Sequence, residues 1–243
     1  MNNIYIYDGS FSNLLNLISY LLENKIKPFN IKITTYNPSL FEQIINIKLK
    51  ENFINEDIFQ NHHLLKTIYY VYLSDNENKE ITIYYFLLNY FKFGNKVFYL
   101  KNLKCVDKTL KIAHLVSHEA HRFKGFTRFK ELKNKVLYAT IAPDNNILPI
   151  ISKHFQKRLK NELWLIKDEN RNIISLYDKK KYYIVCCDEF KLLDTTLSEN
   201  EINLEILWKI FFKTVAIKER ENKRCQMNFM PKKYWQNIIE MSD

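Results

Sequence analysis

Three histidines of this 243-residue chain, His114, His118 and His121, are spaced so that one helix would carry them together. Separations of four and three residues place the imidazoles on one flank of a helix, where they could bind a metal. However, HEAH is not the zinc motif H-E-x-x-H, and no acidic or cysteine residue is positioned to complete a metal shell. The spacing favours structural histidines at the edge of a core, so we expect no metal site and no cofactor.

A cluster of cations surrounds these histidines. Between positions 111 and 135 seven Lys and Arg residues stand against two acids, a net charge of +5 in 25 residues. Arg122, Lys124 and Arg128 could contact phosphates, and Phe126 or Phe129 could stack on a base. Gly125 predicts a positive φ or a close backbone approach where a helix gives way to a strand. The pattern favours core packing for the rings and a functional role for the cations.

A second cluster covers residues 213–235, again with seven cations, two acids and a net charge of +5. Its side chains supply phosphate contacts, hydrogen bonds to base edges and stacking surfaces, which is the mixture that nucleic-acid binding uses. The candidate binding residues are Lys213, Arg220, Asn222, Gln226, Lys232, Lys233, Tyr234 and Trp235. An equally open alternative is a solvated helix face with internal ion pairs and with the last two rings packed on the core.

No complete catalytic signature is present. The three glycines are too far apart for a phosphate-binding loop, and the chain has no Walker, Rossmann or G-x-S-x-G pattern. The candidates for a catalytic acid or base are Asp8, Glu119, His121 and Glu219. Nothing in the sequence pairs two of them, and a capping role for Asp8 or Ser10 at a helix start is the favoured alternative for those two residues.

Hydrophobic periodicity predicts the elements that position these residues. In the first half we expect a strand, a turn at Asp8-Gly9-Ser10, a helix, and an extended connection over 24–38. From about 39 to 121 the pattern is mostly helical, with breaks near 52–56, 74–80 and 94–95. The last of these helices carries an apolar stripe, made by Leu103, Val106, Leu110, Ala113 and Val116.

After Gly125 the pattern becomes β-prone. A hairpin around the sequence KNK, a helix after Pro149 and three further strands give the order β-β-α-β-β-β, which predicts a mostly antiparallel sheet with a helix against one face. Ser198 and Glu201 match a capping box, so a helix should start there and continue through 204–219. A short helix should follow and end at Pro231.

The expected fold class is therefore α+β: an N-terminal strand and a largely helical block, a central mostly antiparallel β-β-α-β-β-β sheet, and C-terminal helices. We expect one family domain over 1–243, with subregions 1–122, 123–190 and 198–243. The net charge of +10 and pI near 9.2 favour anionic partners. The four cysteines form no C-x-x-C pair, and neither a signal peptide nor a membrane span is indicated, which predicts a cytoplasmic protein with reduced thiols.

Several segments together resemble an uncharacterised bacterial family assigned to DNA metabolism and DNA repair: YDGSF, EAHRFKGFTRF, LPIISKHFQKR, LWLIKD and WKIFFKTVAIKERENKRCQMNFMPKKYW. Members are encoded beside a radical-SAM protein related to spore photoproduct lyase, and the domain is also found fused to uracil-DNA glycosylase-like domains. The resemblance implies DNA repair or modification in the company of that radical-SAM partner.

The family pattern falls on four groups of positions: Tyr7, Asp8, Gly9 and Ser10; Glu119, His121, Arg122, Lys124, Gly125, Phe126, Arg128 and Phe129; His154 and Phe155; Trp208, Lys213, Glu219, Arg220, Asn222, Gln226, Met230, Pro231, Tyr234 and Trp235. Many relatives have Arg where this chain has Lys232-Lys233, which keeps the charge but loses bidentate phosphate recognition.

The leading hypothesis is a DNA-repair-associated protein that binds DNA through both basic segments and acts with the radical-SAM partner. The alternatives are an enzyme that itself acts on damaged bases or the DNA backbone, and an interaction subunit of the radical-SAM protein that does not bind DNA. Exposure of Phe126, Tyr234 and Trp235 would favour DNA stacking, and burial of these rings would favour a scaffold role.

Overall fold

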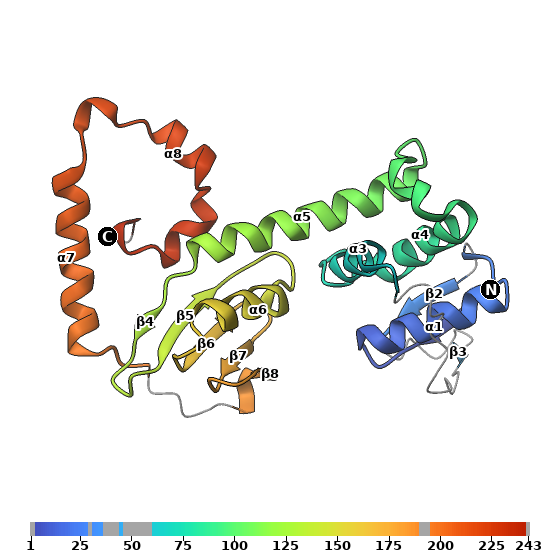
Figure 1. The fold of residues 1–243 in the computed structure, drawn as a ribbon, viewed down its shortest axis with the longest axis horizontal. Helices are drawn as coiled ribbons and strands as arrows, with labels where there is room; N and C mark the ends of the chain where they lie inside the picture. The colour runs from blue at the N-terminus through green and yellow to red at the C-terminus, as the bar shows by residue number, and fades with distance from the viewer. Residues whose placement is uncertain (1–2, 29–30, 36–43, 46–59, 190–194, 242–243) are drawn as a thin grey trace. The chain divides into compact units, whose positions relative to one another are not determined.

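The computed structural model in Figure 1 describes most of the chain, namely residues 3–28, 31–35, 44–45, 60–189 and 195–241. The fold class is α+β, as the sequence predicts. The chain divides into two compact units, residues 1–118 and 119–243, and the boundary lies within one long helix. Within the described ranges every helix is too short or too polar to span a lipid bilayer.

The first unit begins with a parallel sheet. In the described residues β1 (Asn3–Ile6) is its middle strand, between β2 (Ile31–Thr34) and β3 (Ile44–Ile45). Ile4 and Tyr5 are both buried, because a central strand of a parallel sheet is covered on its two faces. The predicted N-terminal strand is confirmed.

Two expectations for this region are wrong. The extended connection contains β2, and positions 44–45 form β3 where the pattern indicated helix. Both strands pair with β1 in parallel, and a parallel partner lies a full crossover away in sequence. Local periodicity therefore carries little information about such pairing. The predicted break near 52–56 lies outside the described residues.

Helices complete the first unit. Helix α1 (Phe11–Glu23) starts at Ser10, whose hydroxyl accepts a hydrogen bond from the amide of Asn13. Helices α3 (His62–Tyr72) and α4 (Lys79–Phe93) are separated at the predicted break, and Gly94, with φ +57°, ends α4 before the 3-10 segment η2 (Gly94–Tyr99). The core includes Leu14, Leu17, Ile18, Ile68, Phe86, Leu87 and Val97.

Helix α5 (Lys104–Phe126) carries the predicted apolar stripe, with Val106, Ala113 and Val116 buried. It ends at Phe126, one residue after Gly125, so the change from helix to strand falls where the sequence indicates. The φ of Gly125 is not positive, and a Cβ added there would meet no atom within 4 Å. The glycine therefore serves neither a left-handed turn nor a close backbone approach.

The second unit contains a sheet whose described strands follow chain order: β4 (Lys130–Glu131), β5 (Leu137–Ile141), β6 (Trp164–Asp168), β7 (Ile173–Tyr177) and β8 (Tyr182–Cys186). All neighbours pair antiparallel except β5 and β6. These two are parallel because α6 (Leu148–Arg158) connects them as a crossover. The predicted β-β-α-β-β-β order and the hairpin between β4 and β5 are confirmed.

Helix α6 packs against β6, β7 and β8, so it covers one face of this sheet. Phe155 of α6 contacts Phe129, and Phe129 also contacts Trp164 of β6, with ring centroids 4.9 and 6.4 Å apart. The interpretation of Phe129 as an inward-facing core ring is therefore confirmed. The four cysteines are free thiols, and a short 3-10 turn, η3 (Cys187–Glu189), follows β8.

The C-terminal part consists of α7 (Glu199–Val215), α8 (Lys223–Phe229) and the 3-10 segments η4 (Lys218–Arg220), η5 (Lys232–Asn237) and η6 (Ile239–Met241), drawn in orange and red in Figure 1. Ser198 caps α7 as predicted, but the helix ends at Val215, before the predicted end. The carboxylate of Glu201 accepts from the amide of Glu131 in β4, so the second half of the capping box is not formed.

Candidate nucleic-acid interface

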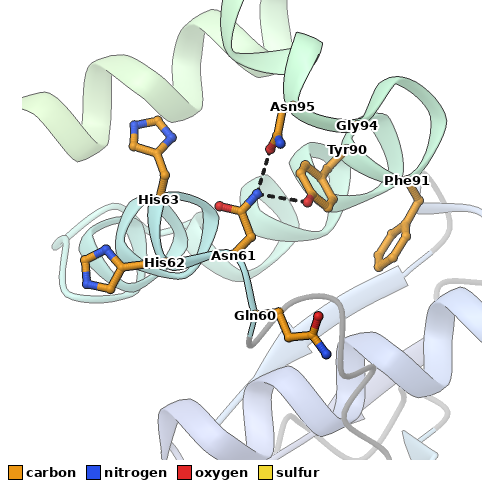
Figure 2. A pocket seen from close by; sticks show the side chains of 8 residues that line it. All are labelled: Gln60, Asn61, His62, His63, Tyr90, Phe91, Gly94 and Asn95. Carbon is orange, nitrogen blue, oxygen red and sulfur yellow. Dashed lines mark hydrogen bonds between the residues drawn. The ribbon is translucent and has the colours of Figure 1, made fainter.

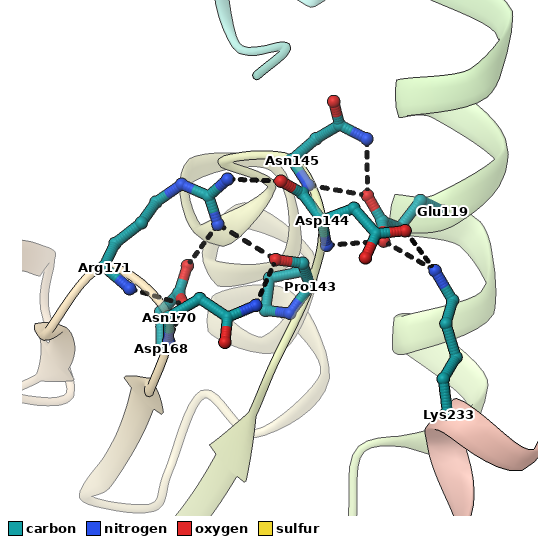
Figure 3. Close-up of polar contacts among 8 residues, drawn as sticks. All are labelled: Glu119, Pro143, Asp144, Asn145, Asp168, Asn170, Arg171 and Lys233. Carbon is teal, nitrogen blue, oxygen red and sulfur yellow. Dashed lines mark hydrogen bonds and ion pairs between the residues drawn. The ribbon is translucent and has the colours of Figure 1, made fainter.

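Glu119 of the first basic segment and Lys233 of the second meet in the second unit (Figure 3). The Nζ atom of Lys233 lies 3.2 Å from Glu119 Oε1 and 2.5 Å from Asp144 Oδ2. Glu119 is 5% exposed and also accepts hydrogen bonds from the amides of Asp144 and Asn145 and from the Asn145 side chain. Burial acts to lower the pKa of Lys233, but the hydrogen bond to Asp144 and the charge of Glu119 outweigh it and raise that pKa.

This arrangement assigns Glu119 a clear local role. Four donors fill its carboxylate, so it holds the loop after β5 and the C-terminal segment against α5. An acid or base catalyst needs an oxygen that can reach a substrate proton, and these contacts leave Glu119 poorly placed for that task. Lys233 is partly neutralised by two carboxylates, so its charge is weakly available to a phosphate.

A second set of contacts braces the same loop from β6 (Figure 3). Asp168 is fully buried at the end of β6 and accepts from the amides of Asn170 and Arg171 and from the Arg171 guanidinium. Arg171 also donates to the carbonyls of Pro143 and Asp144. Burial raises the pKa of Asp168, although Arg171 opposes the shift. The loops that follow the two parallel strands are thus tied to each other by these polar contacts.

The rings near this junction are packing residues. Tyr234 is 4% exposed, and its ring centroid lies 5.1 Å from those of Phe123 and Phe126. Arg122 covers the same ring at 5.9 Å, and the indole N–H of half-buried Trp235 donates to the carbonyl of Met230. Tyr234 has no free face for a base, and Phe126 and Trp235 are half-buried beside it, so by the criterion above these three rings favour a scaffold role at this junction.

The cations of the first segment differ in how far they are neutralised. Lys111, Lys130 and Lys135 form ion pairs with Asp107, Glu205 and Glu131, at nitrogen–oxygen distances of 2.7, 2.7 and 3.0 Å. Arg128 instead donates to the Gly125 carbonyl, at 3.1 Å.

Lys124 has no carboxylate partner in the part of the chain that the structure describes. The pKa of His154 is lowered by burial and, to a lesser extent, by the nearby charges of Lys124 and Arg158. Lys124, which is half-buried, and Lys133, which is exposed and likewise has no described carboxylate partner, are therefore available to phosphate.

The second segment forms part of a pocket of about 970 Å³ between α7 and α8. Four predicted nucleic-acid-binding residues line it: Lys213, Arg220, Asn222 and Gln226. Lys218 adds a third cation, and aromatic rings are contributed by Trp208, Phe211, Phe212 and Phe229. Lys232 is exposed but does not line this pocket. The tertiary structure thus gathers cations, amides and rings in one hollow, which sequence order alone does not establish.

These pocket rings are solvent-exposed: 43% for Trp208, 55% for Phe211, 40% for Phe212 and 78% for Phe229. Trp208, Phe211 and Phe212 belong to α7, in which no residue is buried. The sequence pattern named Phe126, Tyr234 and Trp235 as possible stacking rings and did not include these four exposed rings among the binding candidates. The available signal was the apolar character of α7 around nearly its whole circumference, which a surface helix does not need.

The remaining candidates for a catalytic acid or base, Asp8, His121 and Glu219, are either hydrogen-bonded to nearby residues or exposed to solvent. Asp8 accepts from the amide and hydroxyl of Ser10 and from the Asn13 side chain, and the hydrogen bonds from Ser10 lower its pKa. Glu219 and His121 are exposed. Of the two expected capping candidates, Ser10 caps α1, and Asp8 holds the turn before it through these contacts.

The predicted histidine face is exposed, so its members do not lie at the edge of a core as expected. His114 and His118 have stacked rings 6.0 Å apart. Among the described residues, no three His, Cys, Asp or Glu side chains are placed to share a metal ion.

A separate pocket of about 690 Å³ lies in the first unit, at the start of α3 (Figure 2). Asn61 accepts from the Leu64 amide to cap this helix, and its amide donates to Tyr90 and Asn95. His62 and His63 point away from each other in Figure 2. The amide is thus used for local structure, and the lining contains none of the predicted site residues.

The fold and the C-terminal pocket define an α+β protein with a basic, aromatic-lined hollow. Residues 77–240 match the family DUF4130, a domain of unknown function, and because the match covers more than half of the chain, the protein belongs to this family. The matched range contains both basic segments and the whole α7–α8 pocket. No curated protein and no solved structure matches the chain.

Proposed function

We propose that this chain is a DNA-repair or DNA-modification protein that binds DNA through its two basic segments and acts with a radical-SAM partner. The α7–α8 pocket is the observation on which the DNA-binding part depends. Lys213, Lys218 and Arg220 line it beside exposed rings and side-chain amides. Cations hold the phosphate backbone, rings stack on bases and amides bond base edges, so this combination supports nucleic acid as the ligand.

The charge balance inside the pocket favours an anion. Its two acidic lining residues, Glu221 and Glu240, each have a partner: Lys223 Nζ lies 4.0 Å from Glu221, and the Trp208 indole N–H donates to Glu240 at 2.9 Å. No described ion pair involves the three lining cations. Their positive charge therefore remains available to a phosphate backbone.

A salt titration tests DNA binding. The affinity of the full chain for a fluorescent oligonucleotide is measured by anisotropy between about 50 and about 200 mM salt, over which several phosphate contacts reduce affinity by orders of magnitude. A linear fall of log K with log[salt] supports the proposal. Absence of binding at the lowest salt, or an affinity that hardly changes with salt, rejects phosphate contacts as its basis.

The radical-SAM partner is proposed from the family resemblance alone. Its test is co-purification of the two full-length proteins with nuclease added. A complex that survives nuclease is a direct protein contact, whereas a complex that nuclease disperses is bridged by DNA. Failure to co-purify in either condition removes the partner from the proposal and leaves DNA binding to be judged by the salt titration.

A second candidate function is an interaction subunit that does not contact DNA. Helix α7 favours it, because none of its residues is buried and apolar side chains such as Ile202, Ile206 and Ile210 are about half exposed. Exposed apolar surface of this kind marks protein contacts in many proteins. Nuclease-resistant capture of the radical-SAM protein together with absent DNA binding would establish this function in place of the first.

A further inference from the structure

We propose that the α7–α8 pocket receives one unpaired nucleobase, so that the chain binds single-stranded or locally opened DNA in preference to an intact duplex. This inference rests on the proposed function and specifies its ligand. The observation behind it is the solvent exposure of the aromatic side chains that line the pocket. Bases in a duplex cover each other's faces by stacking, and a protein ring can therefore stack on a base only after that base has left the helix.

The pocket has the size for such a ligand. Its volume of about 970 Å³ lies at the upper end of the range for small-molecule pockets, about 300 to 1,000 Å³. One nucleotide with part of its neighbours fits a space of this kind, whereas an uninterrupted duplex offers only groove edges to it. The hollow therefore matches a nucleotide better than a stretch of paired DNA.

Trp208 provides a ring that is already held in place. Its indole N–H donates to Glu240 in η6, and its ring lies 5.7 Å from that of Phe211 at an interplanar angle of 35°. Trp208 is nevertheless 43% exposed, and Phe212, which follows Phe211 in α7, is 40% exposed. A fixed and accessible ring loses little freedom when a base stacks on it, which favours binding.

Two amides in the pocket offer complementary hydrogen-bonding groups. The Asn222 carbonyl oxygen accepts from the Cys225 amide to cap α8, which leaves its NH₂ group without a partner among the described residues. The Gln226 NH₂ group contacts the Met241 sulfur at 3.6 Å, a weak acceptor, which leaves the Gln226 carbonyl oxygen to accept. One donor and one acceptor, four residues apart, suit the donor–acceptor edge of an unpaired base.

The test compares Phe212→Ala with Tyr183→Ala in the full chain. Tyr183 is the matched control, because its ring is 38% exposed and lies under Lys181 but is outside the pocket. Binding is measured to a thymidine oligonucleotide, to the same strand in a duplex, and to that duplex with one mismatched base. Circular dichroism confirms that both variants fold, and Trp208→Phe provides a second pocket variant.

We expect Phe212→Ala to weaken single-strand binding by about 5- to 100-fold, the effect of removing one stacking ring, while its salt slope stays unchanged. We expect Tyr183→Ala to bind the single strand as tightly as the unsubstituted chain does. The unsubstituted chain should bind the single strand more tightly than the duplex, and one mismatch in the duplex should restore part of the lost affinity. Trp208→Phe keeps a ring and should lose less than Phe212→Ala.

Equal affinity for strand and duplex, with Phe212→Ala indistinguishable from Tyr183→Ala, overturns this inference. The proposed function survives that result if binding remains salt-dependent. If no DNA binds at all, the proposed function itself fails. If Phe212→Ala instead abolishes nuclease-resistant capture of the radical-SAM protein and leaves DNA affinity intact, the pocket binds protein and the inference is also rejected.

Discussion

The ammonium group of Lys233 lies 3.2 Å from the buried carboxylate of Glu119, a residue 114 positions earlier in the chain. This contact joins the two basic segments at one point, and Tyr234 beside it packs on Phe123 and Phe126. At this junction two of the proposed DNA-contacting side chains, Lys233 and Tyr234, make internal contacts instead. The surface left for a ligand is therefore formed by other residues, above all those of the α7–α8 pocket.

We expect Glu119→Gln to lower the free energy of unfolding by about 1 to 3 kcal/mol, because one carboxylate oxygen becomes an NH₂ group that faces donors in a buried site. Urea denaturation monitored by circular dichroism measures the change. Glu162→Gln, at an exposed position of the same unit, should have no measurable effect. Equal stability of the two variants would show that the Glu119 contacts do not hold the loop.

Arg171→Met should cost about 3 to 5 kcal/mol at neutral pH, because it leaves the fully buried Asp168 without its counter-charge. The folded-state pKa of Asp168 is already raised by burial, and removing Arg171 raises it further. A raised carboxyl pKa means that the folded state holds the proton of Asp168 more tightly than the unfolded state does. The contribution of Asp168 to the free energy of unfolding is therefore most favourable at low pH and is lost as pH rises through the folded-state pKa.

The deficit of Arg171→Met relative to the unsubstituted chain should therefore shrink as pH is lowered. Urea unfolding at a series of pH values below neutral measures it, since protonated Asp168 needs no counter-charge. Lys157→Met, on the exposed face of α6, serves as the control with no pH-dependent deficit. A deficit of the same size at every pH value of the series would contradict the assigned role of Arg171.

Ser198→Ala should destabilise α7 by about 1 kcal/mol, the usual cost of removing an N-cap. The hydroxyl accepts from the Glu201 amide at 3.1 Å and donates to Glu131 at 2.9 Å, so Ser198→Thr should retain most of the stability. Thermal unfolding compares the two variants. A loss as large for threonine as for alanine would exclude the hydroxyl contacts as the cause.

Lys124→Gln should weaken DNA binding and lower the slope of log K against log[salt] by about 1, as expected for one lost phosphate contact. Lys135→Gln should change neither, because Glu131 already neutralises Lys135 at 3.0 Å. Anisotropy titrations of both variants decide the matter. A larger effect at Lys135 would mean that internal ion pairing does not govern which cations of the first segment reach DNA.

Local rules allowed much of the fold to be predicted. Helix α1 after Ser10, helix α7 after Ser198 and the hairpin between β4 and β5 depend on contacts within a few residues, and all are confirmed. The parallel strands β2 and β3 were missed, because their partner is distant in sequence and nothing in their own pattern identifies it.

The sequence by itself determined the fold class, the helix caps and the two concentrations of positive charge, since each follows from neighbouring residues. Only the tertiary structure decided that Tyr234 is buried, that Trp208 is exposed beside Arg220 and Asn222, and that Lys233 is held by Glu119. Whether a ring packs or stays open to solvent depends on which distant segment covers it. The hydrophobic periodicity of one helix cannot predict which distant segment will pack against it.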